Sequence, residues 1–599
     1  MKQPIFVAVF CCLIAVSLMQ GQVTTATIYG TVMDPTGATV PGATITIRNT
    51  GTGIRSSATS DIRGAFSFAA IPTGSYEVAI SAAGFRNERR TGFDLGAGQE
   101  LRLDFKLELG ATADVLVVEA STPLVNAVNA EQTTELPAKA MQELPTARRD
   151  WTGLMTLGNG LSTNQERGSL SLNGLPSAGF RFTVDGVDAE GQSVIPSFSA
   201  YQNFNHIKGV STAAVESVTV TKGIASADIA STLSGNVNVT TRSGTNELHG
   251  EAFLLNNVED FNARDQFLSS RSPTTFNQYG GAVGGPIIKN KLFYFGAYEG
   301  YQLRSFAAVT GTVPSLDLRT TALAAVPAYK ALFDLFPQPN TPVAPGALTG
   351  LYQGAGSKQE HENHVTVRSD YYISSSTNAS FRYTRGRPFY TEPRIVPGNP
   401  RDYNGYSEAG SASLFHVTPR WVFETRFGIN YNDVNRLDGL YTLGIPAIRK
   451  FMGIDSAGGE TLFQGGRTMT WEEDVRVRIG QHSLKFGGSY LRRLGERQNI
   501  QVPEIRYANM ADLLANIPNQ VQVTFGVREF HLRTFNLGFF LQDDWKVSPR
   551  LMVNLGMRYD YFAPPSEDEG RLFNRTGPFG LGPFIPGGEA PWNPDRNDF

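Results

Sequence analysis

Cysteine is almost absent from this chain. The 599 residues include two, Cys11 and Cys12, and both lie in an apolar run near the start of the sequence. If that run is removed after export, no disulfide can staple the remainder of the chain. A large exported protein without disulfides is more typical of a bacterial envelope than of an animal extracellular space.

A membrane-spanning helix is also missing from the sequence. The apolar run from Ile5 to Met19 follows Lys2 and precedes small and polar residues. This pattern predicts a secretory signal peptide over residues 1–22, although no clean Ala-x-Ala marks its cleavage site. No later stretch approaches the ~20 consecutive apolar residues that a spanning helix needs. If the protein is integral to a membrane, we therefore expect it to cross as a β-barrel.

The chain has no marked excess of charge of either sign. It contains 52 Lys and Arg residues against 55 Asp and Glu residues, a formal net charge of -3. This balance gives no reason to propose a nucleic-acid partner.

Patterns typical of catalytic or metal sites are lacking as well. The segment HENH, from His361 to His364, does not have the i, i+4 histidine spacing of a zinc helix, so we expect solvated loop residues there. The Gly-rich YGGAVGGP stretch precedes no helix, and no G-x-S-x-G is present. We predict no catalytic residue, no metal and no cofactor, and hence not an enzyme.

Glycine and aromatic residues, in contrast, are abundant. The 62 glycines and the aromatic content of 11% favour a mainly β chain with many turns. In residues 23–110, strand-like runs such as TATIYGTVMD, ATITIRN, AFSFAAI, SYEVAISA and ELRLDFKLE alternate with Pro- and Gly-containing turns. Turns this dense predict a small antiparallel β-sandwich.

The same residues resemble a carboxypeptidase regulatory-like domain, which has a carbohydrate-binding-like fold. The resemblance covers GTVMDPTGATVPGATITIRN and TSDIRGAFSFAAIPTGSYEVAISAAGF. It implies no peptidase activity, and no zinc-ligand set is present in this stretch. The domain is either a module that contacts partners or glycans, or a folded spacer.

Residues 111–245 predict a mixed α/β domain. They begin with a short apolar run, DVLVVEA, whose position between two domains favours an exposed strand that pairs through its main chain. One or two short helices broken at Pro145 follow, and then several strands with an Asp185-Gly186 turn. Arg148, Arg149 and Asp150 are expected either on a solvated helix face or in contacts between this domain and a surrounding barrel.

This second region resembles the plug domain of TonB-dependent outer-membrane receptors of the Oar-like branch, which carry a carboxypeptidase regulatory-like domain before the plug. The resemblance lies in the order of several short motifs, whose marker residues are Asn173, Gly174, Asp185, Gly186, Glu216, Arg242, Ser243 and Gly244. It implies that the run before the plug is the TonB box, although the run could equally be the first plug strand. The residues of this candidate box are Asp114, Val115, Leu116, Val117, Val118, Glu119 and Ala120.

Residues 246–599 predict an antiparallel transmembrane β-barrel. Eleven segments alternate apolar and polar residues, as Trp421, Phe423, Phe427, Ile429 and Tyr431 do against their neighbours. The connections between segments alternate short and long, as in outer-membrane barrels and unlike soluble sandwiches. The eleven predicted strands lie near 248–256, 275–283, 291–301, 363–373, 377–386, 408–417, 420–431, 470–479, 483–492, 533–546 and 550–562.

We interpret the apolar faces as lipid-facing, with Trp545, Tyr559 and Tyr561 suited to an interfacial aromatic girdle. A large array of soluble sandwiches is the alternative. Eleven strands are about half of the ~22 in plugged transporter barrels, so we expect the barrel to be about half present and the chain to be truncated.

These resemblances imply a TonB-dependent receptor and transporter in the cell outer membrane of a Gram-negative-type bacterium. Its expected partners are TonB, outer-membrane lipid and an extracellular solute such as a siderophore, a glycan or a peptide. The N-terminal sandwich favours carbohydrate slightly. Two alternatives stay open: a barrel that organises or attaches the cell surface without transport, and a non-functional gene fragment.

Overall fold

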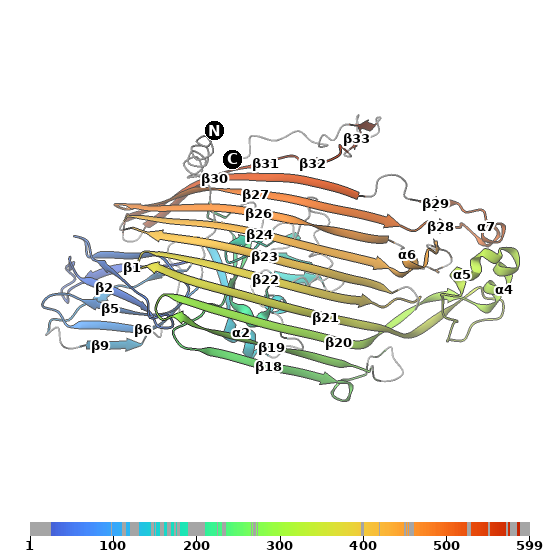
Figure 1. Ribbon diagram of the computed structural model, residues 1–599, viewed down its shortest axis with the longest axis horizontal. Coiled ribbons are helices and arrows are strands. Elements are labelled where there is room, and N and C mark those ends of the chain that lie inside the picture. Colours follow the sequence, from blue (N-terminus) through green and yellow to red (C-terminus); the bar gives the residue numbers. More distant parts are fainter. Residues whose placement is uncertain are drawn as a thin grey trace, which may run out of the picture.

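The computed structural model shows a mainly β protein (Figure 1). In the described part of the chain, no helix is long and apolar enough to cross a membrane. The described residues are 25–96, 99–110, 115–119, 131–144, 149, 151–155, 161–164, 169–172, 175–176, 180–189, 210–223, 226–229, 235–264, 266, 271, 273–396, 400–418, 420–448, 451, 453–454, 460–523, 529–548, 551–570, 573–575 and 584–586.

The N-terminal region folds as the predicted sandwich of two sheets. One has the order β4-β1-β7 with β8 also on β1, and the other the order β3-β2-β5-β6-β9. Alternate residues of both sheets point inward, and Ile28, Ile45, Val78 and Phe105 are among the side chains in a single core. The strands are β1 (Ala26–Met33), β2 (Thr44–Asn49), β3 (Arg55–Thr59), β4 (Ala65–Ile71), β5 (Gly74–Ser81), β6 (Asn87–Leu95), β7 (Glu100–Arg102), β8 (Phe105–Lys106) and β9 (Val115–Glu119).

Two sandwich strands were not among the predicted ones. β3 reads RSSAT and exposes most of its surface, and β6 reads NERRTGFDL with two consecutive arginines. Neither has the apolar alternation that marks the other strands. Both form because a neighbouring strand, β2 or β5, supplies main-chain partners, with one irregularity in the β5–β6 ladder between Tyr76 and Val78.

The second domain has a five-stranded mixed sheet with the order β10-β16-β17-β14-β15. Short helices pack on it, and Trp151 stacks on Phe182 with ring centroids 5.9 Å apart. As predicted, helices occur on both sides of Pro145. The elements are β10 (Glu131–Pro137), α2 (Ala138–Glu143), α3 (Trp151–Leu154), β11 (Leu161–Asn164), β12 (Ser169–Leu172), β13 (Leu175–Pro176), β14 (Phe180–Val184), β15 (Val187–Asp188), η5 (Thr212–Ala214), β16 (Val215–Gly223) and β17 (Gly235–Thr241).

The third region forms one long antiparallel sheet, which lies beside the second domain in Figure 1. Consecutive long strands are neighbours throughout, and all eleven predicted strands are present. They are β18 (His249–Val258), β19 (Thr275–Ile288), β20 (Leu292–Pro314), β21 (Thr349–Ser374), β22 (Thr377–Glu392), β23 (Arg401–Val417), β24 (Trp421–Asp438), β26 (Glu460–Ile479), β27 (His482–Gln501), β30 (Glu529–Ser548) and β31 (Leu551–Phe562), with the short β32 (Ser566–Glu567) on β30.

The polarity of this long sheet is inverted relative to a soluble protein. The face toward the second domain buries charged side chains, such as Glu424 and Arg426 at 1% exposure each. The opposite face exposes large apolar side chains, among them Phe427 at 48% and Met557 at 61%. An exposed apolar surface of this extent marks a membrane or protein interface.

The alternation of short and long connections is also observed, with one difference from the prediction. The tight turns fall where predicted, between β19 and β20, β21 and β22, β23 and β24, β26 and β27, and β30 and β31. The long connections are shorter than predicted because the strands extend further. β20 has 23 residues and β21 has 26, more than twice the ~9–11 that cross a bilayer.

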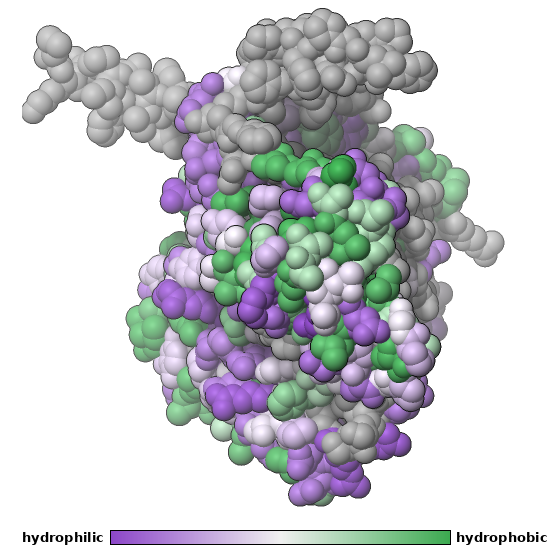
Figure 2. All heavy atoms as spheres, turned by 90° about the vertical axis from the view of Figure 1, so that its right-hand side faces the viewer, coloured by the Kyte–Doolittle hydropathy of each residue, from purple (hydrophilic) through white to green (hydrophobic). Residues whose placement is uncertain are grey.

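The long connections fold into a layer with a hydrophobic core of its own. Buried residues from several connections meet there, including Leu318, Phe333, Phe451 and Leu513. Figure 2 looks onto this end of the molecule, where apolar and polar side chains are intermixed. The elements are α4 (Leu316–Ala325), η7 (Pro327–Tyr329), α5 (Lys330–Phe333), α6 (Gly439–Leu443), β25 (Ala447–Ile448), β28 (Glu504–Arg506), α7 (Met510–Ala515) and β29 (Gln520–Gln522). In the connection after β18, η6 (Glu259–Phe261) buries no residue. Two further short strands, β33 (Phe573–Arg575) and β34 (Phe584–Pro586), pair with each other.

The sandwich lies at the opposite end, beside the tight turns (Figure 1). Asn246 links the two: its N–H donates to Gly51 O at 2.9 Å, and its side-chain amide donates to Asn290 Oδ1 at 2.7 Å in the turn after β19. Ala69 of β4 packs against Phe415 and Val422 of the long sheet. In outer-membrane barrels the tight turns face the periplasm, so the sandwich sits where an exported, non-spanning domain is expected.

Candidate functional site

The turn between β14 and β15 carries the predicted residues Asp185 and Gly186. Both adopt left-handed backbone conformations, with φ of 49° and 76°. Two consecutive positive φ values close a two-residue hairpin of type I′, where Asp-Gly is favoured. Asn238 of β17 fixes the turn, because its Oδ1 accepts hydrogen bonds from Gly186 N at 3.0 Å and Thr183 Oγ1 at 2.9 Å.

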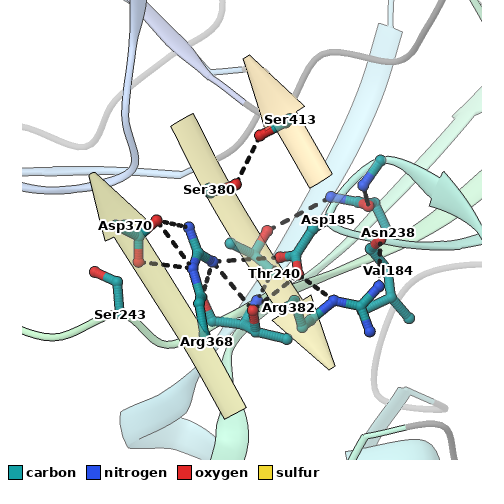
Figure 3. A network of polar contacts seen from close by, with 12 residues as sticks. Val184, Asp185, Asn238, Thr240, Ser243, Arg368, Asp370, Ser380, Arg382 and Ser413 are labelled. Carbon is teal, nitrogen blue, oxygen red and sulfur yellow. Dashed lines mark hydrogen bonds and ion pairs between the residues drawn. The ribbon is translucent and has the colours of Figure 1, made fainter. Parts of the chain in front are cut away.

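The carboxylate of Asp185 joins the second domain to the wall of the long sheet (Figure 3). It accepts hydrogen bonds from Thr241 N and Thr241 Oγ1, both at 2.8 Å. From the wall, Arg382 Nε lies 2.7 Å from Asp185 Oδ2, and Arg368 Nη1 lies 3.5 Å from Oδ1. The turn therefore places one negative charge between two arginines of β21 and β22.

Arg368 is itself held in a fixed orientation. Its Nη2 donates to Asp370 Oδ1 at 2.8 Å and its Nε to Asp370 Oδ2 at 3.0 Å. Its Nη1 also donates to the backbone oxygen of Thr241 at 2.7 Å. Two arginines and two aspartates thus form a charge-balanced network, which removes much of the cost of burying them.

Two further ion pairs, which the sequence did not single out, flank the same turn. Arg181 Nη2 donates to Glu472 Oε1 of β26 at 2.6 Å, and both side chains are almost fully buried. Asp188 lies 3.6 Å from Arg493 of β27. Arg181 and Asp188 flank the turn in FRFTVDGVD, and charges within an otherwise apolar hairpin are the signal that could have identified them.

A third contact joins the predicted Arg242 to the first barrel strand. Arg242 Nη1 lies 2.9 Å from Glu251 Oε1, and its Nε lies 3.8 Å from Glu216. Arg149 reaches the same glutamate at 3.5 Å and lies over the ring of Phe253 at 4.2 Å. Of the two alternatives expected for Arg149, the structure shows the domain–barrel contact. Arg148 and Asp150 lie outside the described residues.

A fourth contact reaches the far end of the long sheet. Ala227 N donates to Gln542 Oε1 of β30 at 2.8 Å, and Arg558 Nη1 of β31 donates to Ala227 O at 3.2 Å. The second domain is thus attached to the sheet from β18 to β31, by these polar groups and, at β18–β20, by an apolar cluster that includes Ala282, Phe295 and Ala297.

Two further predicted residues of this domain lie beside the contacts. Gly244 packs so closely on β20 that a Cβ there would approach Tyr294 O to 2.2 Å, which explains the glycine. Ser243 is exposed and makes one long hydrogen bond, to Gly244 O. Asn173 and Gly174 lie outside the described residues.

The candidate TonB box is described in part. Val115–Glu119 form β9, which pairs in parallel with β6 at the edge of the sandwich, from Asn87↔Val115 to Thr91↔Glu119. β9 is not a member of the sheet of the second domain. Asp114 and Ala120 lie outside the described residues.

The HENH segment is not the solvated loop that the sequence suggested. It lies in the middle of β21, where His361 and His364 point to opposite faces of the sheet. His361 stacks on Phe389 with centroids 4.5 Å apart, and buried His364 lies 3.1 Å from Glu362. The error arose because β21 continues well beyond the region of clear alternation. Within the described residues, no group of three His, Cys, Asp or Glu side chains is placed to hold a metal.

Comparison with known proteins finds three matching domain families. Residues 27–108 match the carboxypeptidase regulatory-like domain, residues 119–237 the TonB-dependent receptor plug domain, and residues 240–579 the outer membrane beta barrel domain. The last of these matches spans more than half of the chain.

One similar curated protein is the TonB-dependent transporter Oar of Myxococcus xanthus. It is 22% identical over 306 residues, which cover 48% of this chain and 28% of that protein. Among solved structures, the outer membrane transporter YddB from Escherichia coli is 12% identical, with a TM-score of 0.47, over 73% of this chain and 57% of that one. The siderophore receptor PirA from Acinetobacter baumannii is 14% identical, with a TM-score of 0.47, over 73% and 58%. The chain thus spans less than two thirds of each.

Proposed function

The chain belongs to the outer membrane beta barrel family and is an Oar-like TonB-dependent receptor, and from this premise we propose that it takes up a large solute actively into the periplasm. Residues 1–22 would direct export, and the family implies an outer-membrane location. The solute would enter from the long-loop end, and displacement of the plug, the domain at residues 111–245, would open its path.

The observation that carries this proposal is the way the plug is held in the barrel. Along β21 to β31 its described contacts with the wall are mainly ion pairs and hydrogen bonds, centred on Asp185 with Arg368 and Arg382. At β18–β20 an apolar cluster that includes Phe295 and Ala297 also joins the plug to the wall. When the polar groups separate in a water-filled lumen, hydration replaces the lost partners, so the net cost of release is small compared with that of an apolar core. A polar interface thus suits a domain that has to move and return.

β9 is suited to receive TonB. It is the last strand of its sheet, and in the described ladders its outer edge pairs with no strand. A partner can therefore add a strand by main-chain hydrogen bonds, which need little sequence specificity. We propose that TonB binds Asp114–Ala120 in this way and pulls the plug.

The cargo would be a siderophore, a glycan or a peptide. The folded layer of long connections would form its receptor surface, because it covers the end of the barrel that faces outward in this family. The sandwich would contact glycans or act as a spacer on the periplasmic side.

A proline in the box tests the role of TonB. Val117→Pro removes a main-chain N–H and is expected to abolish binding of the periplasmic domain of the host's TonB, measured by isothermal titration calorimetry. Val117→Thr keeps the N–H and is the matched control, with expected binding close to that of the unchanged protein. Undiminished binding by Val117→Pro would contradict the assignment of the box.

Growth of the host tests transport. A host strain that carries its own gene with residues 114–120 deleted is expected to stop growing on one member of a panel of solutes. The panel offers ferric siderophores as the sole iron source, and glycans or peptides as the sole carbon source. Unchanged growth on the whole panel, together with lost surface attachment, would instead support the surface-organising alternative.

A further inference from the structure

A cleft of about 1500 Å³ separates the sandwich from the tight-turn end of the barrel. One wall comes from β3, β4 and neighbouring residues of the sandwich, and the other from the turns after β21, β26 and β30. We call it the interdomain cleft. It lies at the end of the long strands where Figure 1 shows the sandwich.

The interdomain cleft is strongly cationic. Eight Lys and Arg side chains line it, against two aspartates, and of the eight Arg476 and Lys485 are paired with carboxylates of the barrel. The chain as a whole has 52 basic and 55 acidic residues, so this imbalance does not follow from composition.

Four of these cations converge from both walls. Arg63 and Arg102 belong to the sandwich, and Arg478 and Lys546 stand beside the turns of the barrel. The positive charges of the first three all act on Lys546, and the negative charge of Asp104 opposes them. Four cations against the two carboxylates Asp61 and Asp104 leave an excess of positive charge, which a bound anion would stabilise.

The nearby carboxylates do not neutralise the group. Asp104 lies 2.9 Å from Arg102, but it also accepts hydrogen bonds from Thr31 N at 3.0 Å and Thr31 Oγ1 at 2.8 Å. Asp61 lies 3.4 Å from Arg63 and accepts from Arg63 N and Ala65 N. Each guanidinium makes one side-chain bond to its aspartate, so donors remain for a ligand. No described carboxylate lies within ion-pair distance of Arg478 or Lys546.

Three of the four cations are exposed, and Lys546 is half-buried. The side chains of Arg63 and Arg102 are 50% and 42% exposed, and Arg478 is exposed at the end of β26. A ligand can therefore enter without unfolding either wall.

We propose that the interdomain cleft is a binding site for a phosphate or carboxylate group, which Arg63 and Arg102 of the sandwich and Arg478 and Lys546 of the barrel hold jointly. Guanidinium groups bind such planar or tetrahedral anions through paired hydrogen bonds, and Lys546 adds a point charge. The anion comes either from a solute on the periplasmic side or from the headgroup of an acidic lipid in the adjacent leaflet. The site does not depend on the proposed transport, since binding is measurable on the isolated protein.

The test is calorimetric titration of the full chain with tripolyphosphate at low ionic strength, in nanodiscs of zwitterionic phosphatidylcholine. We expect saturable binding, weakened at least tenfold in Arg478→Gln/Lys546→Gln and also in Arg63→Gln/Arg102→Gln. The control pair Arg86→Gln/Lys106→Gln removes two cations from the sandwich that do not line the cleft, and is expected to bind as the unchanged protein does.

A second arm distinguishes the two sources. In nanodiscs containing phosphatidylglycerol, a lipid headgroup in the cleft would compete and lower the affinity for tripolyphosphate, whereas a site for a soluble anion would keep it. Equal binding by the Arg478→Gln/Lys546→Gln variant and the unchanged protein would overturn the proposal that the two walls share the site. The same holds if the sandwich pair alone weakens binding, because the site would then belong to one wall.

Discussion

At the scale of single residues, Asp185 has two roles: its backbone closes a turn, and its carboxylate binds the barrel wall. The sequence motif indicates only the turn. Its backbone occupies the left-handed region, which aspartate tolerates better than most residues, and closes the β14–β15 turn. That conformation directs the carboxylate toward Arg382 and Arg368 of the barrel wall. A turn residue is therefore also the centre of the contact that holds the plug.

Removing this charge should loosen the plug. Asp185→Asn removes the carboxylate that pairs with the buried Arg382, whereas Arg368 keeps Asp370, and breaking a buried pair costs on the order of 3 kcal/mol. We expect faster hydrogen exchange in residues 180–188, measured by mass spectrometry of the protein in detergent. Ser243→Ala, an exposed position in the same domain, should leave the exchange unchanged, and equal exchange in both variants would contradict the role of Asp185.

Asp61 makes the stability of the sandwich depend on pH. Partial burial alone would raise the pKa of this carboxyl, but hydrogen bonds from Ala65 N and Arg63 N outweigh it and lower the pKa below its ordinary value. A lowered folded-state pKa contributes stability above about pH 4, which is lost as the pH falls through the folded value.

Asp61→Asn should consequently destabilise the sandwich at pH 7 and have little effect at about pH 2. The measurement is urea unfolding of residues 23–110, followed by circular dichroism. The core of this domain consists of its own residues, so the fragment is expected to fold alone. A difference of the same size at both pH values would show that the carboxylate charge is not responsible.

At the scale of elements, the long strands continue past the part that spans the membrane. β20 and β21 stay paired from Leu292↔Tyr371 to Pro314↔Thr349, although the apolar alternation ends much earlier. Main-chain hydrogen bonding sustains this extension, and the connections pack on it as a folded layer. Tyr329 joins η7 to α7 there, because its hydroxyl donates to Tyr507 Oη at 2.7 Å and lies 3.0 Å from Leu513 O.

Tyr329→Phe should loosen the layer without disturbing the barrel. The change removes the hydrogen bonds of the Tyr329 hydroxyl to Tyr507 and Leu513, and a hydrogen bond contributes about 0.5–1.5 kcal/mol to stability. We expect faster cleavage by protease between residues 502 and 528, followed by electrophoresis, at an unchanged barrel unfolding temperature. The exposed Tyr441→Phe is the control, and equal cleavage of the two variants would argue against a cooperative layer.

At the scale of the whole molecule, the polarity of the two faces of the long sheet explains where the plug lies and what covers the outside. The long sheet turns charged side chains inward, onto the plug, and large apolar side chains outward. A polar inner face needs a polar plug, and the contacts at Asp185, Arg181 and Arg242 supply it. The outer face needs hydrocarbon rather than water.

Phe427→Arg tests the lipid contact. Phe427 stands six residues from the start of β24, near the middle of the expected apolar band, where an arginine costs about 2–4 kcal/mol. We expect a lower yield of folding into phosphatidylcholine vesicles, measured by heat-modifiable electrophoresis. Leu443→Arg alters a similarly exposed apolar residue of the outer layer and should fold normally. Equal folding of both would exclude a lipid-facing position.

The sequence by itself determined the features that depend on residues close together in the chain, namely the strands, the turns and the motifs. Period-two alternation located all eleven long strands and the tight turns between them, because each strand carries its own inner and outer face. The sandwich, the Asp185-Gly186 turn and the family resemblance also followed from local patterns. Local patterns did not predict strands β3 and β6 or the outer halves of β20 and β21. These segments are stabilised by pairing with neighbouring strands and not by their own residue composition.

Tertiary structure alone decided which distant charges meet. Nothing local pairs Arg181 with Glu472, 291 residues away, or Asp185 with Arg382, because ion pairs require proximity and not a sequence spacing. The same holds for the parallel pairing of β9 with β6 and for the cations gathered in the interdomain cleft. The fold could be predicted in outline because strands encode their faces, whereas the sites could not, because folding brings their residues together from separate elements.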